Sequence, residues 1–214
     1  MNSALCLTEL LGLCLSFTGY ICCLVSLFIP QWLTFSSGML VNESYLLGLW
    51  HICVSQDVGS SVCQEHGTLL ELPLHIQMTR ILVCLSVLTG TLGFMVSTPA
   101  LTCVKCLDNS KHYVKRVISI VGGSLFILAG AMIFCPVSYF AHDVMQNFWD
   151  ITLPKDFPRW EYGNAMFSGW VGGILFVAGG IILIISQIFI NSESRLQRNQ
   201  PIERNHASFQ MEYV

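Results

Sequence analysis

Charged residues are scarce in this chain. Only 11% of its 214 residues are Asp, Glu, Lys or Arg, whereas about 25% is usual for a soluble globular protein. The hydrophobic fraction is correspondingly high, at 53%. These proportions exclude an ordinary soluble domain. The length leaves room for one membrane domain and a short tail.

Two further absences exclude whole classes of function. The sequence lacks a basic cluster large enough to bind nucleic acid, since its densest basic group contains only Lys105, Lys111, Lys115 and Arg116. It also lacks the Gly-x-Ser-x-Gly, Walker and His-Glu-x-x-His motifs. We therefore predict neither an enzyme nor a cofactor, and no nucleic-acid partner.

Four apolar runs are each long enough to cross a bilayer, which requires about 20 helical residues. They occupy approximately residues 10–29, 81–102, 117–140 and 165–190. None of the runs contains Asp, Glu, Lys or Arg, so no intramembrane proton relay or ion site is indicated. We predict a four-span α-helical membrane domain over 1–190. A cleaved signal peptide is the alternative for the first run, but Glu9 and no basic residue precede it.

The distribution of basic residues predicts the orientation. Four of them lie in the short loop 103–116, and three more lie in the tail, at positions 195, 198 and 204. The loops 30–79 and 141–164 together contain only Lys155 and Arg159. Because Lys and Arg accumulate on the cytoplasmic side, both termini and the loop 103–116 are expected inside. The other two loops are then extracellular.

The tail, 191–214, is polar and has no apolar periodicity, so it is predicted to be disordered. It ends in Tyr213-Val214. A free terminal Val can add as a strand to a PDZ domain, with its side chain in an apolar pocket and its carboxylate held by backbone N–H groups. The tail is therefore expected to bind PDZ scaffold proteins.

The cysteines fall into three groups. Cys53 and Cys63 are the two in the predicted extracellular loops, and that compartment favours a disulfide over free thiols. Cys103 and Cys106 lie where the second span meets the cytosol, so S-palmitoylation and unmodified thiols both remain open. The others are interpreted as small apolar fillers of the spans: Cys6, Cys14, Cys22, Cys23, Cys84 and Cys135.

Polar features of the extracellular loops indicate modification and ion attraction more than metal binding. Asn42-Glu43-Ser44 is a possible N-glycosylation site. The histidines at 51, 66, 75 and 142 are irregularly spaced, which favours solvated or packed side chains over zinc ligands. The two loops hold eight acidic residues against two basic ones. Such a surface either enriches cations in a narrow water space or is simply a solvated loop.

Taken together, these residues resemble the claudin family. The resemblance rests on Trp32, Gly48-Leu49-Trp50, Cys53 and Cys63 between the first two spans, and on Arg80 just before the second. Further similarity lies in the second loop and the chain's end, at Phe148-Trp149, Pro154, Arg159-Trp160-Glu161-Tyr162-Gly163, Gly169-Trp170 and Tyr213-Val214. It covers residues 8–190 and the last two.

The resemblance implies a left-handed four-helix bundle capped by a small extracellular antiparallel β-sheet. Four strands would come from the first loop and one from the second. Claudins polymerise side by side in the plasma membrane and adhere between cells at tight junctions, where they control paracellular permeability. Other claudins, in cis and in trans, and PDZ scaffold proteins are then the expected partners.

The resemblance also assigns candidate roles to residues. Candidates for lining the paracellular path are Asp57, Gln64 and Glu65. Candidates for trans adhesion are Phe148, Trp149, Pro154, Arg159 and Glu161. Strongly charge-selective claudins often carry Asp or Lys directly after the second cysteine, whereas this chain has Gln64, so at most a modest cation preference is expected. The alternative function is that of a four-helix relative that modulates another membrane protein in cis.

Overall fold

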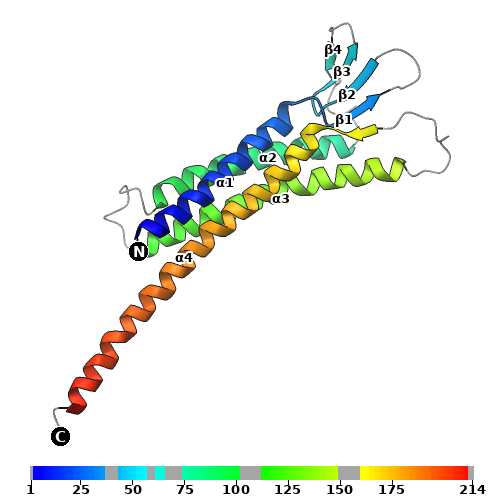
Figure 1. Cartoon of the computed structure of the whole chain (residues 1–214). Helices are drawn as coiled ribbons and strands as arrows, with labels where there is room; N and C mark the ends of the chain where they lie inside the picture. The colour runs from blue at the N-terminus through cyan, green and yellow to red at the C-terminus, as the bar shows by residue number, and fades with distance from the viewer. Residues whose placement is uncertain are drawn as a thin grey trace.

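The computed structural model describes residues 2–36, 43–56, 61–65, 74–101, 112–148 and 160–211. Within these ranges the elements are α1 (Asn2–Phe28), β1 (Leu33–Ser36), β2 (Glu43–Leu47), β3 (His51–Gln56), β4 (Ser61–Glu65), α2 (Leu74–Ser97), the 3-10 turn η2 (Thr98–Ala100), α3 (His112–Phe148), β5 (Trp160–Tyr162) and α4 (Asn164–Met211). Figure 1 shows the four long helices side by side, with the strands gathered at one end of the bundle. The N-terminus lies at the opposite end.

All four predicted spans are present as long apolar helices. The segments that are long and apolar enough to cross a membrane are Cys6–Phe28, Leu74–Ala100, Val114–Gln146 and Asn164–Phe189. Helix α2 begins several residues before the predicted position 81, and α3 continues past 140 to Phe148. Parts of the predicted loops are therefore helical. The apolar runs underestimated these helices because backbone hydrogen bonds continue where hydropathy falls.

The sequence predicts that the tail is disordered. In the structure, residues 191–211 instead continue α4 as helix. Figure 1 shows this part of α4 extending well beyond the other three helices. Starting a helix is the costly step, whereas adding residues to an existing one is nearly neutral for good helix formers. The Glu, Gln and Arg residues after position 191 are such residues.

Glycines place α4 directly against two neighbouring helices. Four pairs are reciprocal, because a Cβ atom on either member would press on the partner's carbonyl oxygen: Gly12–Gly179, Gly19–Gly172, Gly123–Gly180 and Gly130–Gly173. A Cβ on Gly180, for example, would lie 2.5 Å from the Gly123 oxygen. Within each helix these glycines are seven residues apart, the repeat of a left-handed supercoil. Close backbone contact of this kind holds helices together in lipid.

The glycines of α2 serve a different purpose, which is to make room for aromatic rings. Atoms of the Phe126 ring lie 2.9 Å from where a Gly93 Cβ would be, and the Phe176 ring is equally close to the Gly90 position. These two rings are stacked with centroids 5.9 Å apart and are fully buried. Phe94 packs edge-on against Phe126. An aromatic layer therefore fills the middle of the bundle.

The bundle contains one buried carboxylate that the apolar runs did not include. Glu9 lies just before the predicted first run, but the structural span Cys6–Phe28 contains it, and its side chain is 1% exposed. The Gln187 amide Nε2 donates a 2.6 Å hydrogen bond to Glu9 Oε1, joining α1 to α4. A buried carboxylate needs such donors. The nearby Cys6 was also misinterpreted, since it forms a disulfide and is not a free apolar filler.

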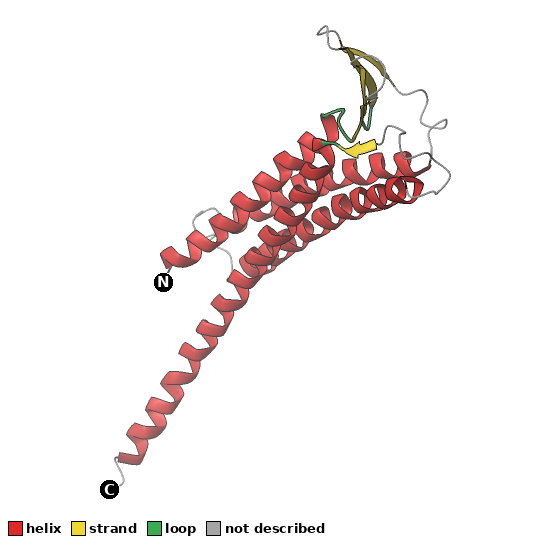
Figure 2. Cartoon of the chain, turned by 45° about the vertical axis from the view of Figure 1, so that its right-hand side comes forward, coloured by secondary structure: helices red, strands yellow, loops and turns green. Residues whose placement is uncertain are grey.

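The strands form a single antiparallel sheet in the order β4-β3-β2-β1-β5. Four strands precede α2 and the fifth precedes α4, as the resemblance implied. At its base, Leu33 of β1 is buried against the helices, and Leu47 and Tyr162 pack beside it. Figure 2 shows β2, β3 and β4 rising beyond the end of the bundle.

Candidate functional site: the sheet and its anchors

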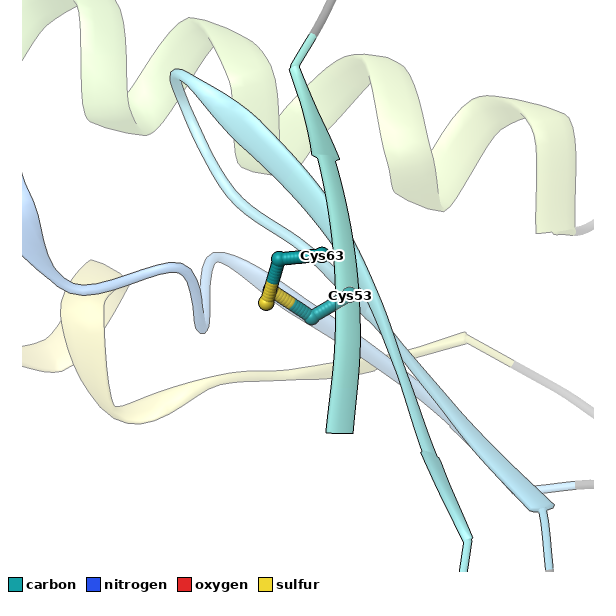
Figure 3. The surroundings of a disulfide bond; sticks show 2 residues. All are labelled: Cys53 and Cys63. Atoms are coloured by element: carbon teal, nitrogen blue, oxygen red, sulfur yellow. A yellow bond between two sulfur atoms is a disulfide. The ribbon is translucent and has the colours of Figure 1, made fainter. Parts of the chain in front are cut away.

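Cys53 and Cys63 form a disulfide, which confirms the pairing predicted from the sequence. The two residues are directly opposite each other on β3 and β4, and their Cα atoms are 4.0 Å apart. Figure 3 shows the bond joining the two neighbouring strands. Cys53 is buried and Cys63 is exposed. The bond fixes the edge hairpin to the rest of the sheet.

Trp32 anchors the start of the sheet to the end of α1. Pro30 has no N–H group, so it cannot donate the helical hydrogen bond to the carbonyl of Ser26, four residues earlier. The indole Nε1 of Trp32 donates to that oxygen instead, at 2.8 Å. Its ring is 1% exposed and packs edge-on against Phe140 of α3. This signature tryptophan therefore compensates for the proline that ends the helix.

The Gly48-Leu49-Trp50 segment makes the turn between β2 and β3. The amide of Gly48 donates a hydrogen bond to the carbonyl of His51, at 2.9 Å. A side chain at position 48 would collide with Pro30, so only glycine fits here. Leu49 is buried in the core, whereas Trp50 is exposed. Each residue of this signature has a separate structural task.

Arg80 of α2 binds two residues of the turn between β2 and β3. Its Nε donates a 2.7 Å hydrogen bond to the Leu49 carbonyl, and its guanidinium carbon lies 5.0 Å from the centre of the Trp50 ring. The side chain is only 5% exposed. A planar guanidinium can donate from its edge while its face stacks on a ring, and the ammonium group of lysine has no such planar face. Sequence alone placed Arg80 at a membrane edge and did not predict either contact.

Backbone and side-chain bonds join the second connecting segment to the first. Strand β5 pairs with β1, and the Gly163 amide donates to the Trp32 carbonyl at 2.9 Å. The Tyr162 hydroxyl donates to the Ala141 carbonyl of α3, at 3.1 Å. The family resemblance includes Tyr162 only as part of the stretch Arg159-Trp160-Glu161-Tyr162-Gly163. Its place in the strand that pairs with β1 could not be read from the sequence.

The sheet separates the two neighbouring residues Gln64 and Glu65, which were both candidates for lining the paracellular path. In an antiparallel pair, directly opposite residues lie on the same face. Gln64 is opposite Ile52, whereas Glu65 is opposite His51 and lies on the face of the disulfide. Both side chains are exposed. They therefore lie on opposite faces of the sheet.

The remaining candidates are only partly described. Phe148 is the last residue of α3, and Glu161 is an exposed residue of β5. The other candidate positions lie outside the described residues: Asn42, Asp57, Cys103, Cys106, Trp149, Pro154, Arg159, Tyr213 and Val214. Among the side chains that the structure describes, no three His, Cys, Asp or Glu residues are grouped so as to hold a metal ion.

Comparison with known proteins gives consistent results along the chain. A model of the family described as "PMP-22/EMP/MP20/Claudin family" matches residues 6–183. The chain is 32% identical to Claudin-1 of Mus musculus over 181 residues, which is 83% of this chain and 85% of that protein. It is 31% identical to Claudin-7 of Rattus norvegicus over 209 residues, covering 96% and 97% of the two chains. It is also 30% identical to Claudin-4 of Homo sapiens over 178 residues, covering 81% and 84%.

Proposed function

The chain belongs to the PMP-22/EMP/MP20/Claudin family, and we propose that it is a structural tight-junction protein that polymerises in cis, adheres in trans and so controls paracellular permeability. Its partners are other claudins, in the same membrane and in the facing one. The observation that carries the proposal is the five-stranded sheet, which is fixed at one end of a four-helix bundle and projects beyond it.

The rigidity of the sheet suits it for contact with other molecules. The disulfide, the Trp32 indole and the Arg80 guanidinium each join the sheet to itself or to a different helix. A surface that is already ordered loses little conformational entropy when it binds, and this preserves affinity. Polymerisation repeats one interface many times, so the geometry of each subunit has to be reproducible.

The orientation belongs to the proposal as well. The basic loop 103–116 and the basic tail favour a cytoplasmic location for both termini. The sheet, which contains the Cys53–Cys63 disulfide, is then extracellular. In this arrangement Tyr213-Val214 is available to PDZ scaffold proteins, Asn42 to glycosylation, and Cys103 and Cys106 to palmitoylation.

A modest cation preference accompanies the barrier. The excess of acidic residues in the two extracellular loops would raise the local concentration of cations at the entrance of a narrow water path. Glu65 is an exposed part of this charge. The charge acts at a distance through water and is screened by salt, so the preference is expected to be small.

Expression in cells that lack junction strands tests the proposal against its main alternative, a four-helix protein that modulates another membrane protein in cis. Freeze-fracture images of cell contacts should show strands when this chain is expressed alone or together with a second claudin. Protein that reaches the surface but stays diffuse under both conditions would contradict the proposal and favour the cis alternative.

Measurements on epithelial monolayers then define the type of barrier. Transepithelial resistance and the sodium-to-chloride dilution potential are recorded together. Rising resistance identifies a seal, and falling resistance with a cation-directed potential identifies a pore. No change in either value, with the protein at the surface, would again favour the cis alternative.

A further inference from the structure

Arg80 carries a buried positive charge for which the described residues supply no counter-ion. Its side chain is 5% exposed. The guanidinium makes one hydrogen bond, to the Leu49 carbonyl, and one ring contact, with Trp50. A carbonyl and a ring each offer only partial negative charge, and no carboxylate in the described part of the chain pairs with Arg80. A cation that is removed from water without a full negative charge beside it is strongly destabilising.

The unpaired donors of Arg80 lie together on one edge of the guanidinium. Nε donates to the Leu49 carbonyl, whereas Nη2 is enclosed and has no acceptor. Among the described residues, Nη1 has no acceptor either. The Nη1–Nη2 edge of a guanidinium presents two parallel N–H groups, which match two oxygens of a carboxylate or a phosphate. This edge therefore fits an oxyanion.

The position of Arg80 along α2 brings it to the level of lipid headgroups. The membrane-spanning segment Leu74–Ala100 has 27 residues, more than the 20 or so that a bilayer core requires. Its helical structure ends at Ala100, at the end of η2. A rise of about 1.5 Å per residue carries the chain about 30 Å, the thickness of the hydrocarbon core, between Ala100 and Arg80. Arg80 is therefore at the boundary of the core on the side of the sheet.

Aromatic side chains mark the same boundary. Trp50 is exposed beside Arg80. Tyr139 of α3 is also exposed, and the next residue, Phe140, packs against His75, which lies between one and two turns from Arg80 on α2. Trp and Tyr are enriched where the hydrocarbon core meets the headgroups. Both rings are therefore where interfacial aromatic residues are expected.

We propose that Arg80 binds the phosphate of a phospholipid in the leaflet on the side of the sheet. The phosphate oxygens accept hydrogen bonds from the Nη1–Nη2 edge, and the Trp50 ring lies beside the headgroup. The acyl chains lie against exposed apolar side chains further along α2, which are Ile81, Leu85 and Leu88. The lipid supplies the negative charge that the described residues do not. This inference requires only that the helices span a membrane, so it does not depend on the proposed function.

The binding of a lipid at this position would join the sheet to the membrane. Arg80 donates to the Leu49 carbonyl in the turn between β2 and β3. A phosphate on the opposite edge of the same guanidinium holds that side chain in place, because bidentate bonds fix both the position and the orientation of a guanidinium. The stability of the base of the sheet then depends on the phospholipid around it.

The experiment measures the Tm of the purified chain in a maltoside detergent, which contains no phosphate. Dioleoylphosphatidylcholine, a galactolipid with the same acyl chains, or inorganic phosphate is added in parallel samples. Phosphatidylcholine should raise the Tm by about 3 °C or more in a saturable manner, because a ligand that binds only the folded state stabilises it. The galactolipid and the inorganic phosphate should each have a much smaller effect.

Variants assign the effect to Arg80. Arg80→Gln removes the charge and should abolish the difference between the two lipids. Arg80→Lys keeps the charge without the paired donors and should retain only part of the difference. Arg198→Gln removes a charge from the part of α4 beyond the bundle and is the matched control, which should keep the full difference. Because Arg80 also anchors the sheet, each variant is compared with itself before and after the addition of lipid.

Three results would overturn the proposal. Equal shifts from phosphatidylcholine and the galactolipid would show that any lipid suffices. A shift of the same size from inorganic phosphate would identify a site for a free anion. A full difference between the lipids in Arg80→Gln would place the phosphate elsewhere.

A second measurement uses only the unchanged chain and decides the matter if the Arg80 variants do not fold. Native mass spectrometry follows lipids that stay bound when the detergent is removed. One phosphatidylcholine should be retained under conditions that release the galactolipid. Equal retention of both lipids would contradict a phosphate site.

Discussion

The indole Nε1 of Trp32 donates a 2.8 Å hydrogen bond to the carbonyl oxygen of Ser26, the acceptor that Pro30 leaves without its helical partner. The bond joins the last turn of α1 to the first residues of the sheet. It also explains why a buried tryptophan follows the proline two residues later. An aromatic ring without a donor would pack here but would leave the carbonyl unpaired.

Replacement of Trp32 by Phe tests this bond. Phe keeps most of the contact with Phe140 but cannot donate, so the buried Ser26 carbonyl loses its partner. We expect the free energy of unfolding to fall by about 1–3 kcal/mol. The measurement is thermal unfolding of the purified protein in detergent. Trp50→Phe, which alters an exposed ring, is the matched control, and an equal effect of both variants would contradict the interpretation.

Replacement of Arg80 by Lys keeps the charge and removes the planar donor. The Leu49 carbonyl would lose its hydrogen bond and Trp50 its stacked guanidinium, at a cost of about 1.5–3 kcal/mol. Tryptophan fluorescence during unfolding reports the change. Met78→Ala, at an exposed position on the same helix, is the control for a general effect on α2. A variant as stable as the unchanged chain would show that charge alone suffices at position 80.

Replacement of Gly180 by Ala should separate α4 from α3. The new Cβ atom would lie 2.5 Å from the Gly123 carbonyl oxygen, so the helices have to move apart. Overpacking of this kind costs about 1–3 kcal/mol. The neighbouring Ile181→Ala changes an exposed side chain and should have little effect. Equal melting temperatures for Gly180→Ala and the unchanged chain would disprove the close contact.

Replacement of Cys53 by Ser should leave Cys63 unpaired and the edge hairpin loose. Loss of the cross-link removes about 2–3 kcal/mol by the loop-entropy model. We expect the variant to be retained inside the cell, as measured by surface biotinylation. The double variant Cys53→Ser, Cys63→Ser separates loss of the bond from the reactivity of a free thiol. Normal surface delivery of the double variant would show that the disulfide is dispensable.

Neutralising Asp57 and Glu65 together tests the modest cation preference. The variant Asp57→Asn, Glu65→Gln should lower the permeability of sodium relative to chloride and leave resistance nearly unchanged, because the charge acts on ions only through water. The dilution potential measures the ratio. Glu212→Gln in the tail is the control for net charge. An unchanged ratio would remove both residues from the ion path.

The sequence predicted which helices and strands the fold contains better than it predicted where each helix begins and ends. The low content of charged residues and the four apolar runs were sufficient to predict the four spans. The family resemblance was sufficient to predict the sheet. The ends of α2 and α3 were missed because an apolar run stops at the first polar residues, whereas the helix continues through Arg80 at one end and Asp143 at the other. Glu9 was missed for the same reason, since only the contact with Gln187 shows that it is buried.

The faces of the sheet could not be predicted because they depend on strand pairing. Alternation along β4 separates Gln64 from Glu65 in any register, but it does not tell which residues of the other strands share a face with either one. The face that carries Val62 is identified by the pairing of Val62 with Val54 and of Val54 with Tyr45. Likewise, the sequence shows glycines seven residues apart without showing which helix each one meets.

The reciprocal glycine pairs also constrain how this protein can evolve. When two side chains collide, a smaller residue on one helix can compensate for a larger one on the other. At Gly123 and Gly180 the atoms that would be struck include the backbone carbonyl oxygen of the partner glycine, which every amino acid carries. No second substitution at the partner position can relieve the clash. Each of these glycines is therefore fixed independently, and variation among descendants should accumulate on the lipid-facing sides of α1, α3 and α4.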